Sequence, residues 1–253
     1  MKAGVFDSGI GGLTVVKSLL ENNLFEEIVY FGDTARVPYG VKDKNTIIRY
    51  SLEALEFFKN FDIDILIIAC NSVSAYALDE LRANANIPIV GVIESGVKAL
   101  ENKIPSKDSN ILVIATNATI ASKKYEKALN NISYKNINSI ATGLFVPIVE
   151  EGIFEGGVLD ATLDHYFKDL VSIDAVILGC THFPLIENNI SRYLNDAVTI
   201  HSGDAIVEYL KVKYNCSSSF KETKTIFFAS ENPDGLKKVA QKWLKGLYND
   251  GKK

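Results

Sequence analysis

The sequence has no long apolar run and no secretory leader pattern. Its most apolar segment spans residues 63–70, far short of the roughly 20 residues that cross a membrane as a helix. Residues 1–7 contain no signal-peptide core before Asp7 interrupts them. We therefore expect a cytoplasmic protein with no membrane partner.

The sequence also has no excess of basic charge. Lysine and arginine number 27 against 31 aspartate and glutamate residues, which gives a net charge of −4. Since binding to nucleic acid usually needs a basic surface, we expect no nucleic acid partner. A small anionic substrate stays open. The chain is otherwise of globular composition, with 47% hydrophobic and 23% charged residues, and its 253 residues correspond to one or two domains.

Cysteine is scarce, and its spacing excludes several chemistries. Cys70, Cys180 and Cys216 include no Cys-x-x-Cys pair, so neither a thioredoxin-type redox site nor a zinc knuckle is encoded. No arginine stands six residues after Cys70 or Cys180, which excludes the phosphate loop of cysteine phosphatases. The three histidines are too scattered to predict a metal site.

What is present is an alternation of short apolar runs with helical patterns. Most of the runs are apolar throughout, as expected for strands that are covered on both faces. Their alternation with helices predicts an α/β protein with mainly parallel sheets. The nine predicted strands are Ala3–Phe6, Ile28–Phe31, Ile63–Ala69, Ile87–Val92, Asn110–Ala115, Ile137–Ala141, Asp174–Leu178, Val198–Ile200 and Thr225–Phe228.

The helical patterns consist of apolar residues that recur every three or four positions. They are clearest in residues 48–55, 159–166 and 186–194. Two polar stretches, residues 104–110 and 215–219, are predicted to be connections.

The sequence contains a weak internal repeat. Residues 64–72 and 174–182 both read as a buried strand, a small residue, a cysteine, a short polar group and the start of a helix. Residues 4–8 and 112–116 form a second matching pair of strand and polar turn. The repeat predicts two similar α/β halves, with the C-terminal segment returning to the first half. The alternative is that any α/β chain contains similar units.

The two matching cysteines are candidate reactive groups. Cys70 and Cys180 each stand where a strand ends and a helix begins, the edge at which parallel α/β folds bind ligands. A helix N-terminus favours the thiolate, so we expect a lowered thiol pKa there. The alternative is a small buried apolar side chain. Cys216 lies in a polar, serine-rich stretch and is predicted to be incidental.

Two loops after predicted strands carry further polar groups. Residues 7–14 form a glycine-rich turn, but Thr14 stands where the dinucleotide-binding fingerprint has its third glycine. Asp7, at the start of this turn, is either a helix cap or a proton acceptor. Residues 32–40 offer an acid, a hydroxyl and a guanidinium group, and a purely structural loop is the alternative.

Five segments in order, residues 6–12, 32–40, 69–72, 91–94 and 179–185, resemble the glutamate racemases, within the cofactor-independent aspartate/glutamate racemase superfamily. The resemblance runs from residue 3 to about residue 210. It implies two three-layer α/β domains related by a pseudo-twofold axis, with the active site in the cleft between them. The domains are expected at residues 1–94 plus 208–253 and at residues 95–207.

The resemblance implies that the chain interconverts L- and D-glutamate without a cofactor or metal and supplies D-glutamate for peptidoglycan synthesis. By family precedent Cys70 takes the α-proton from D-glutamate and Cys180 takes it from L-glutamate. Asp7 and His182 match the residues that assist these thiols, and Glu150 is a further candidate. Members of the family often form homodimers, and no stretch of this sequence specifies such an interface.

The expected substrate-binding residues are mostly hydroxyl and amide side chains. Ser72 and Val73 stand where Thr-Ala is usual in the family, and Ser95 stands where proline is usual. Because Ser72 keeps the hydroxyl, we expect substrate binding to be retained. The residues that match binding positions are Ser8, Tyr39, Gly40, Asn71, Ser72 and Thr181, with Thr116 and Thr119 expected to help from the second half.

Racemisation removes a proton from one face of a carbon and returns one to the other face. Two bases on opposite faces need not move, and two similar halves that face each other supply that relation. Three other functions stay open at this stage. They are aspartate racemase activity, non-catalytic amino-acid binding on the same scaffold, and hydrolysis by a single nucleophilic thiol with an oxyanion hole.

Overall fold

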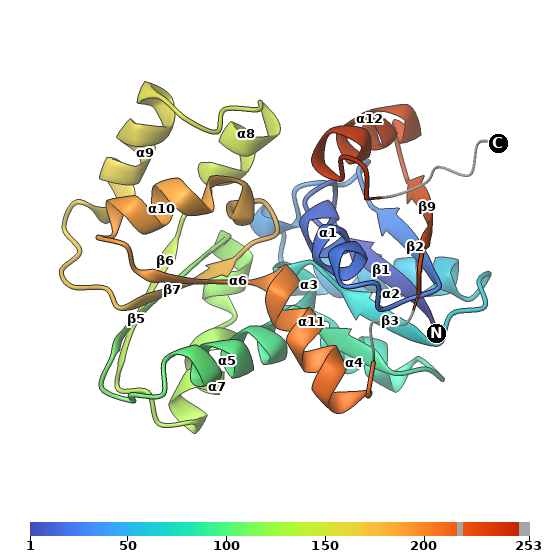
Figure 1. Ribbon diagram of the computed structural model, residues 1–253, viewed down its shortest axis with the longest axis horizontal. Helices are drawn as coiled ribbons and strands as arrows, with labels where there is room; N and C mark the ends of the chain where they lie inside the picture. The colour runs from blue at the N-terminus through green and yellow to red at the C-terminus, as the bar shows by residue number, and fades with distance from the viewer. Residues whose placement is uncertain (217–219, 248–253) are drawn as a thin grey trace.

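A computed structural model of the chain describes residues 1–216 and 220–247. These residues form two parallel sheets that lie side by side, each covered by helices on both faces (Figure 1). All nine predicted strands are present, with bounds that differ from the predicted ones by at most a few residues. The predicted connection at residues 104–110 is confirmed up to Asn110, where a strand begins. In the other predicted connection, residues 217–219 lie outside the described residues.

The first sheet has five strands, β1 (Lys2–Asp7), β2 (Glu27–Gly32), β3 (Ile65–Ile68), β4 (Ile89–Gly91) and β9 (Lys224–Ala229). Their order is β4-β3-β1-β2-β9, and every neighbouring pair is parallel. The C-terminal strand therefore returns to the first sheet, beside β2.

The second sheet has four strands, β5 (Asn110–Ala115), β6 (Asn136–Ala141), β7 (Ala175–Gly179) and β8 (Val198–His201). Their order is β6-β5-β7-β8, again with parallel pairs throughout. Read from the other edge, this order repeats that of β4-β3-β1-β2. The predicted pair of similar α/β halves is thus confirmed, and β3 and β7, which precede the two matched cysteines, occupy equivalent places.

Helices cover both faces of the first sheet because alternate strand residues point to opposite sides. Ala3 and Val5 pack in one core with residues of α1, α11 and α12, whereas Phe6 packs on the other side with residues of α2, α3 and α4. The helices named here are α1 (Leu13–Glu21), α2 (Lys44–Phe58), α3 (Asn71–Tyr76), α4 (Leu78–Ala83), α11 (Ser202–Lys213) and α12 (Pro233–Trp243), and the loop after β2 contains the short 3₁₀ helix η1 (Tyr39–Val41).

The second sheet is covered in the same way. Leu112 and Ile114 pack on one face with α8, α9, α10 and η2, and Ile111 and Val113 pack on the other with α5 and α7. These helices are α5 (Val92–Lys103), α7 (Lys124–Asn131), α8 (Phe145–Glu150), α9 (Gly157–Phe167), η2 (Phe183–Ile186) and α10 (Glu187–Tyr193). The short helix α6 (Asn117–Ala121) follows β5 directly, and its Ala118 packs in the core with Phe6 of the first sheet.

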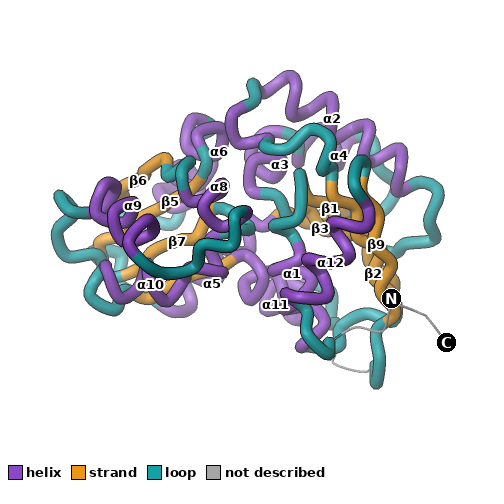
Figure 2. The backbone as a smooth tube through the Cα atoms, turned by 90° about the horizontal axis from the view of Figure 1, so that it is seen from above, coloured by secondary structure: helices purple, strands orange, loops and turns teal. Residues whose placement is uncertain are grey.

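Two helices cross between the halves. Helix α5 follows β4 of the first sheet, yet its residues Ile93 and Leu100 lie in the core of the second sheet. Helix α11 follows β8 of the second sheet, yet its residues Ile206 and Leu210 lie in the core of the first. The two helices pack against each other and lie side by side between the two halves (Figure 2). The predicted domain boundaries fall inside these two helices, and the division at those residues stays a prediction.

Candidate functional site

A cavity lies where the carboxyl ends of the central strands of both sheets meet. This cavity is lined by ten of the residues that were predicted from the sequence to form the site. Parallel strands place the loops that follow them at one edge of a sheet, so the turns after β1, β3, β5 and β7 come together there. The lining residues are Ser8, Val37, Pro38, Tyr39, Gly40, Cys70, Asn71, Ser72, Thr116, Val146, Gly179, Cys180, Thr181 and His182.

Three assigned residues, Asp7, Glu150 and Thr119, do not line the cavity. Each instead lies behind it and contacts a residue that does. Asp7 accepts a hydrogen bond from Thr181, at 3.4 Å, and a carboxylate oxygen of Glu150 lies 3.1 Å from Nε2 of His182. The hydroxyls of Thr119 and Ser72 are 3.1 Å apart. All the assigned residues therefore belong to one connected site.

Cys70 lies between β3 and α3 and is almost fully buried. Its thiol donates to Oγ of Ser8 over 3.4 Å. Burial, together with the charge of Asp7, raises the pKa of Cys70 to about 12. The expected lowering of this pKa is therefore wrong. Helix α3 has only six residues, and its dipole is too weak to offset the loss of solvation.

Cys180 occupies the equivalent place between β7 and η2, with a different neighbour. Its sulfur lies 3.7 Å from Nδ1 of His182, whose other ring nitrogen contacts Glu150. Burial opposes a charge on this ring, but the hydrogen bonds to Cys180 and Glu150 prevail and raise the pKa of His182 to about 10. At neutral pH the ring is therefore an imidazolium that can donate a proton to both neighbours.

Asp7 ends β1 and is fully buried. Its carboxylate accepts from the backbone N–H of Gly9 at 3.0 Å, and burial raises its pKa, while the charge of His182 opposes that shift. Because it also accepts from Thr181, this acid of the first half reaches the half that carries Cys180. The glycine-rich turn allows the two halves to approach each other here, because a Cβ at Gly11 would lie only 2.7 Å from Cε1 of His182.

Hydroxyl groups from both halves form a cluster at the cavity. Ser72 lies 2.9 Å from Thr116 and 3.1 Å from Thr119, and the two threonine hydroxyls are themselves 3.1 Å apart. Thr116 also caps α6 by accepting from the backbone N–H of Thr119. The cluster thus provides hydroxyls that can donate or accept hydrogen bonds, drawn from α3 and from the N-cap and first turn of α6.

The loop of residues 32–40 both contributes residues to the cavity and has a structural role. Tyr39 and Gly40 line the cavity, while Asp33 is fully buried and holds the loop together. Asp33 accepts from the Tyr39 hydroxyl, from Nε of Arg36 at 2.6 Å and from Oγ of Ser230 at 2.7 Å. Ser230 follows β9, so the C-terminal strand helps to position this side of the site.

Several residues that contribute to the site were not predicted from the sequence. Val37 and Pro38 lie inside the loop just described, and Val146 lies in α8, where its apolar side chain gave no signal. Tyr125 of α7 and Ser202 of α11 hydrogen-bond to Asn71. Neither carried a motif, because their relation to the site depends on how the two halves pack.

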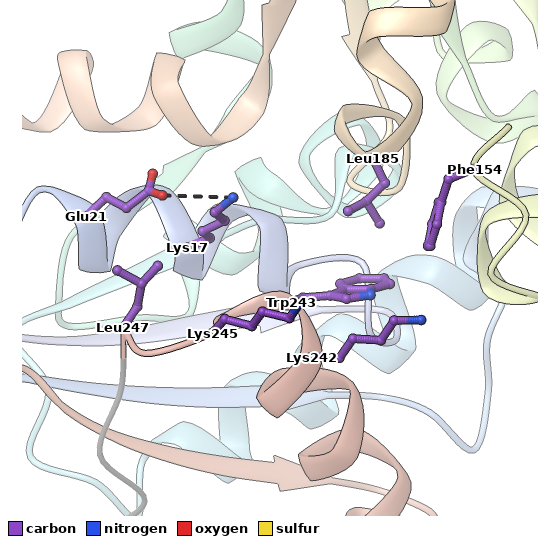
Figure 3. Close-up of a pocket in the computed structure, with 8 residues that line it drawn as sticks. All are labelled: Lys17, Glu21, Phe154, Leu185, Lys242, Trp243, Lys245 and Leu247. Carbon is purple, nitrogen blue, oxygen red and sulfur yellow. Dashed lines mark ion pairs between the residues drawn. The ribbon is translucent and has the colours of Figure 1, made fainter.

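Cys216, in contrast, lies away from the cavity, buried in the core beneath α1 and α11. A second hollow lies between α1, α12 and the second half (Figure 3). Trp243 of α12 faces Phe154 and Leu185 across it, and Lys17 pairs with Glu21 at 3.9 Å on α1. None of its eight lining residues belongs to the site with the thiols.

Residues 1–216 and 220–247 contain no helix long and apolar enough to cross a membrane. In the same described residues no group of three or more His, Cys, Asp or Glu side chains is arranged to hold a metal ion. The chemistry available in the cavity is that of two thiols, an imidazolium, hydroxyls and amides. Such a set can move protons at a small polar molecule held between the two halves.

The chain is similar to known proteins over nearly its whole length. The family model described as Asp/Glu/Hydantoin racemase matches residues 16–210. The chain is 64% identical to a glutamate racemase of Nitratiruptor sp. over 98% of both chains, and 57% identical to one of Campylobacter jejuni over 96% of this chain and 98% of the relative.

Solved structures agree. A crystal structure of glutamate racemase from Campylobacter jejuni matches with a TM-score of 0.96 and 56% identity, over 98% of this chain and all of the other. An aspartate racemase of Picrophilus torridus, at 18% identity and a TM-score of 0.58, shares the fold over 83% of this chain and 92% of the other. The chain therefore belongs to the Asp/Glu/Hydantoin racemase family and is an isomerase.

Proposed function

We propose that the protein interconverts L- and D-glutamate by proton transfer between the substrate α-carbon and the two thiols of Cys70 and Cys180. The observation that carries this proposal is that the two thiols, at equivalent places in the two halves, line one cavity. The relatives with the substrate in their names support glutamate, since they cover the chain at up to 64% identity. The D-glutamate formed would serve peptidoglycan synthesis in the cytoplasm.

In the direction from L to D, Cys180 is the base and Cys70 is the acid. Cys180 takes the α-proton, the bonding electron pair stays on the carbon, and Cys70 gives its own proton to the opposite face. The raised pKa of Cys70 supports this assignment, because the thiol carries its proton at neutral pH. The reverse direction exchanges the two roles and restores the starting state.

His182 and Ser8 assist different thiols in this scheme. His182 donates toward Cys180 and is held by Glu150, so it stabilises negative charge on that sulfur. Ser8 lies 3.4 Å from the Cys70 sulfur and can return a hydrogen bond when that sulfur loses its proton. Asp7 acts through Thr181 and through the field it exerts on His182 and Cys70.

The α-carbanion needs fixed donors around its carboxylate, because the charge develops there. The cavity offers the hydroxyls of Ser72, Thr116 and Thr181 and the amide of Asn71. Tyr39 and Gly40 close the same cavity from the first half. We assign these groups, with Ser8, to holding the two carboxylates and the amino group of glutamate. Thr119, which lies behind the cavity, helps by positioning the hydroxyls of Ser72 and Thr116.

The test uses protein from which metals and small cofactors have been removed by chelation and gel filtration. The protein is incubated separately with L-glutamate and L-aspartate, and optical rotation is followed. We expect rotation to decay to zero with L-glutamate and to stay constant with L-aspartate. Constant rotation with L-glutamate, or faster decay with L-aspartate, would overturn the assignment.

A further inference from the structure

A buried hydrogen-bonded chain crosses between the two halves directly behind the cavity. The hydroxyl of Tyr125, on α7, lies 2.7 Å from Oδ1 of Asn71, on α3. Nδ2 of Asn71 donates to Oγ of Ser202, at the start of α11, over 3.3 Å. All three side chains are buried, and only Asn71 lines the cavity. The amide of Asn71 is therefore held at both ends by residues outside the cavity.

The Tyr125 ring is fixed by its own packing. It lies in the core beneath the second sheet, and a Cβ on Gly179, the residue before Cys180, would come within 3.3 Å of its Cε2. Burial, with the nearby Cys180, raises the pKa of the Tyr125 phenol, so the hydroxyl keeps its proton. A buried hydroxyl proton without an acceptor is costly, and Oδ1 of Asn71 is the acceptor that this geometry supplies.

This arrangement decides which group Asn71 can offer to a ligand. Its Oδ1 accepts from Tyr125, and one N–H of its amide is donated to Ser202. Among the described residues, no acceptor takes the second N–H of Asn71. The amide is thus held as a donor, and the groups of glutamate that accept from a donor are its carboxylates.

We propose that Tyr125, although outside the cavity, is a positioning residue that locks the Asn71 amide so that its free N–H is donated to a substrate carboxylate. This inference rests on the proposed function. Without the phenolic hydroxyl the amide could turn over and present its oxygen, which would repel a carboxylate. Loss of this hydroxyl is therefore expected to weaken substrate binding in both the ground state and the transition state.

The test is a double-mutant cycle of Tyr125→Phe and Asn71→Ala, with KM and kcat measured for both enantiomers. Tyr125→Phe should raise KM about tenfold with a smaller change in kcat, the size expected for one hydrogen bond to a charged group. Added to Asn71→Ala, it should cause no further rise in KM, because a residue that acts only through Asn71 has nothing left to position.

Tyr134→Phe is the matched control. Tyr134 lies in the same core, and its hydroxyl donates to the backbone carbonyl of Ile104, so the variant loses a comparable hydrogen bond without touching Asn71. Its KM should equal that of the wild type. Should Tyr125→Phe fold poorly, Ser202→Ala removes the other restraint on the amide and should also raise KM.

The outcomes separate this inference from the function on which it rests. A wild-type protein that does not racemise glutamate overturns both. An active wild type whose KM is unchanged in Tyr125→Phe, or rises equally on the Asn71→Ala background, overturns the positioning role alone. So does a Tyr134→Phe variant with the same rise in KM, because the effect would then belong to the core.

Discussion

Nδ1 of His182 lies 3.7 Å from the sulfur of Cys180, whereas the residue at the equivalent place after Cys70 is Ser72, whose hydroxyl contacts Thr116 instead. The two thiols thus occupy matching positions in a repeated fold but have unlike neighbours. One faces an imidazolium and the other a serine hydroxyl, Ser8. This difference makes the two proton transfers separately testable.

Replacing His182 by asparagine should slow proton transfer at Cys180 and leave transfer at Cys70 nearly unchanged. Since the enantiomers are equal in free energy, kcat/KM must fall by the same factor in both directions, so rates alone do not distinguish the thiols. The α-deuterium isotope effect does. We expect it to increase for L-glutamate, where the labelled proton leaves to Cys180, and to shrink for D-glutamate.

Ser8→Ala is the counterpart for the other thiol, because Ser8 contacts the sulfur of Cys70. It should increase the isotope effect for D-glutamate and shrink the one for L-glutamate. Equal isotope effects in both variants would contradict the assignment of one thiol to each face.

The three cysteines should differ sharply in their importance for activity. Cys70→Ser and Cys180→Ser should each lower kcat/KM by about 10²–10⁴, the usual span for lost acid–base catalysis, because a serine hydroxyl is a far weaker acid than a thiol. Cys216→Ser should keep normal kinetics, because Cys216 is buried away from the cavity. Near-normal racemisation by both of the first two variants would refute the mechanism with two thiols.

Asp7→Asn should reduce turnover by about 10²–10⁴ while the fold is kept. The buried carboxylate has no solvent to replace its charge, and it acts on Thr181, His182 and Cys70 at once. The measurement is the pH dependence of kcat/KM for the variant and the wild type. A profile that keeps both its height and its shape would remove Asp7 from the mechanism.

The pair of His182 and Glu150 should make stability depend on pH. Because the pKa of His182 in the folded protein, about 10, is above its unfolded value of 6.5, its stabilising effect is complete below pH 6.5 and is lost as pH rises to 10. Glu150→Gln should therefore lower the free energy of unfolding at pH 6 by about 1 kcal/mol, a modest value because Glu150 is partly exposed.

Urea unfolding at pH 6 and above pH 10 measures this difference. The deficit of Glu150→Gln should vanish at the higher pH, where His182 is neutral in both proteins. Glu151→Gln, at the neighbouring exposed acid, is the control and should match the wild type at both pH values. A deficit that persists unchanged above pH 10 would mean that Glu150 stabilises the fold without the charge on His182.

The strands and the repeat could be predicted because they depend on local patterns. Continuous apolar runs mark buried parallel strands, and the matched segments that end in Cys70 and Cys180 reflect equivalent positions in the two sheets. The buried face of α2 was predicted less accurately. Of the predicted repeat of Ile48, Leu52 and Leu55, only Leu55 is buried, while Ile48 and Leu52 are half-buried. The rest of the buried face runs through Ile47, Ala54 and Phe58.

The long-range contacts of the site could not be read from the sequence. Asp33 meets Ser230 across almost the whole chain, and Tyr125 meets Asn71 only because the two halves pack together. The pKa of Cys70 was misjudged for a related reason. A cysteine before a helix predicts a lowered pKa, but how deeply that cysteine is buried depends on tertiary packing, and burial is the larger effect here.

The most direct test of two thiols acting on opposite faces is racemisation of L-glutamate in D₂O, stopped at low conversion and analysed for α-deuterium in each enantiomer. Two separate bases predict that nearly all D-glutamate formed carries deuterium, because the proton it receives comes from the exchanged thiol of Cys70, while the remaining L-glutamate keeps its protium. D-glutamate that retains the substrate's own α-protium would show a single base carrying one proton across, and would contradict the account.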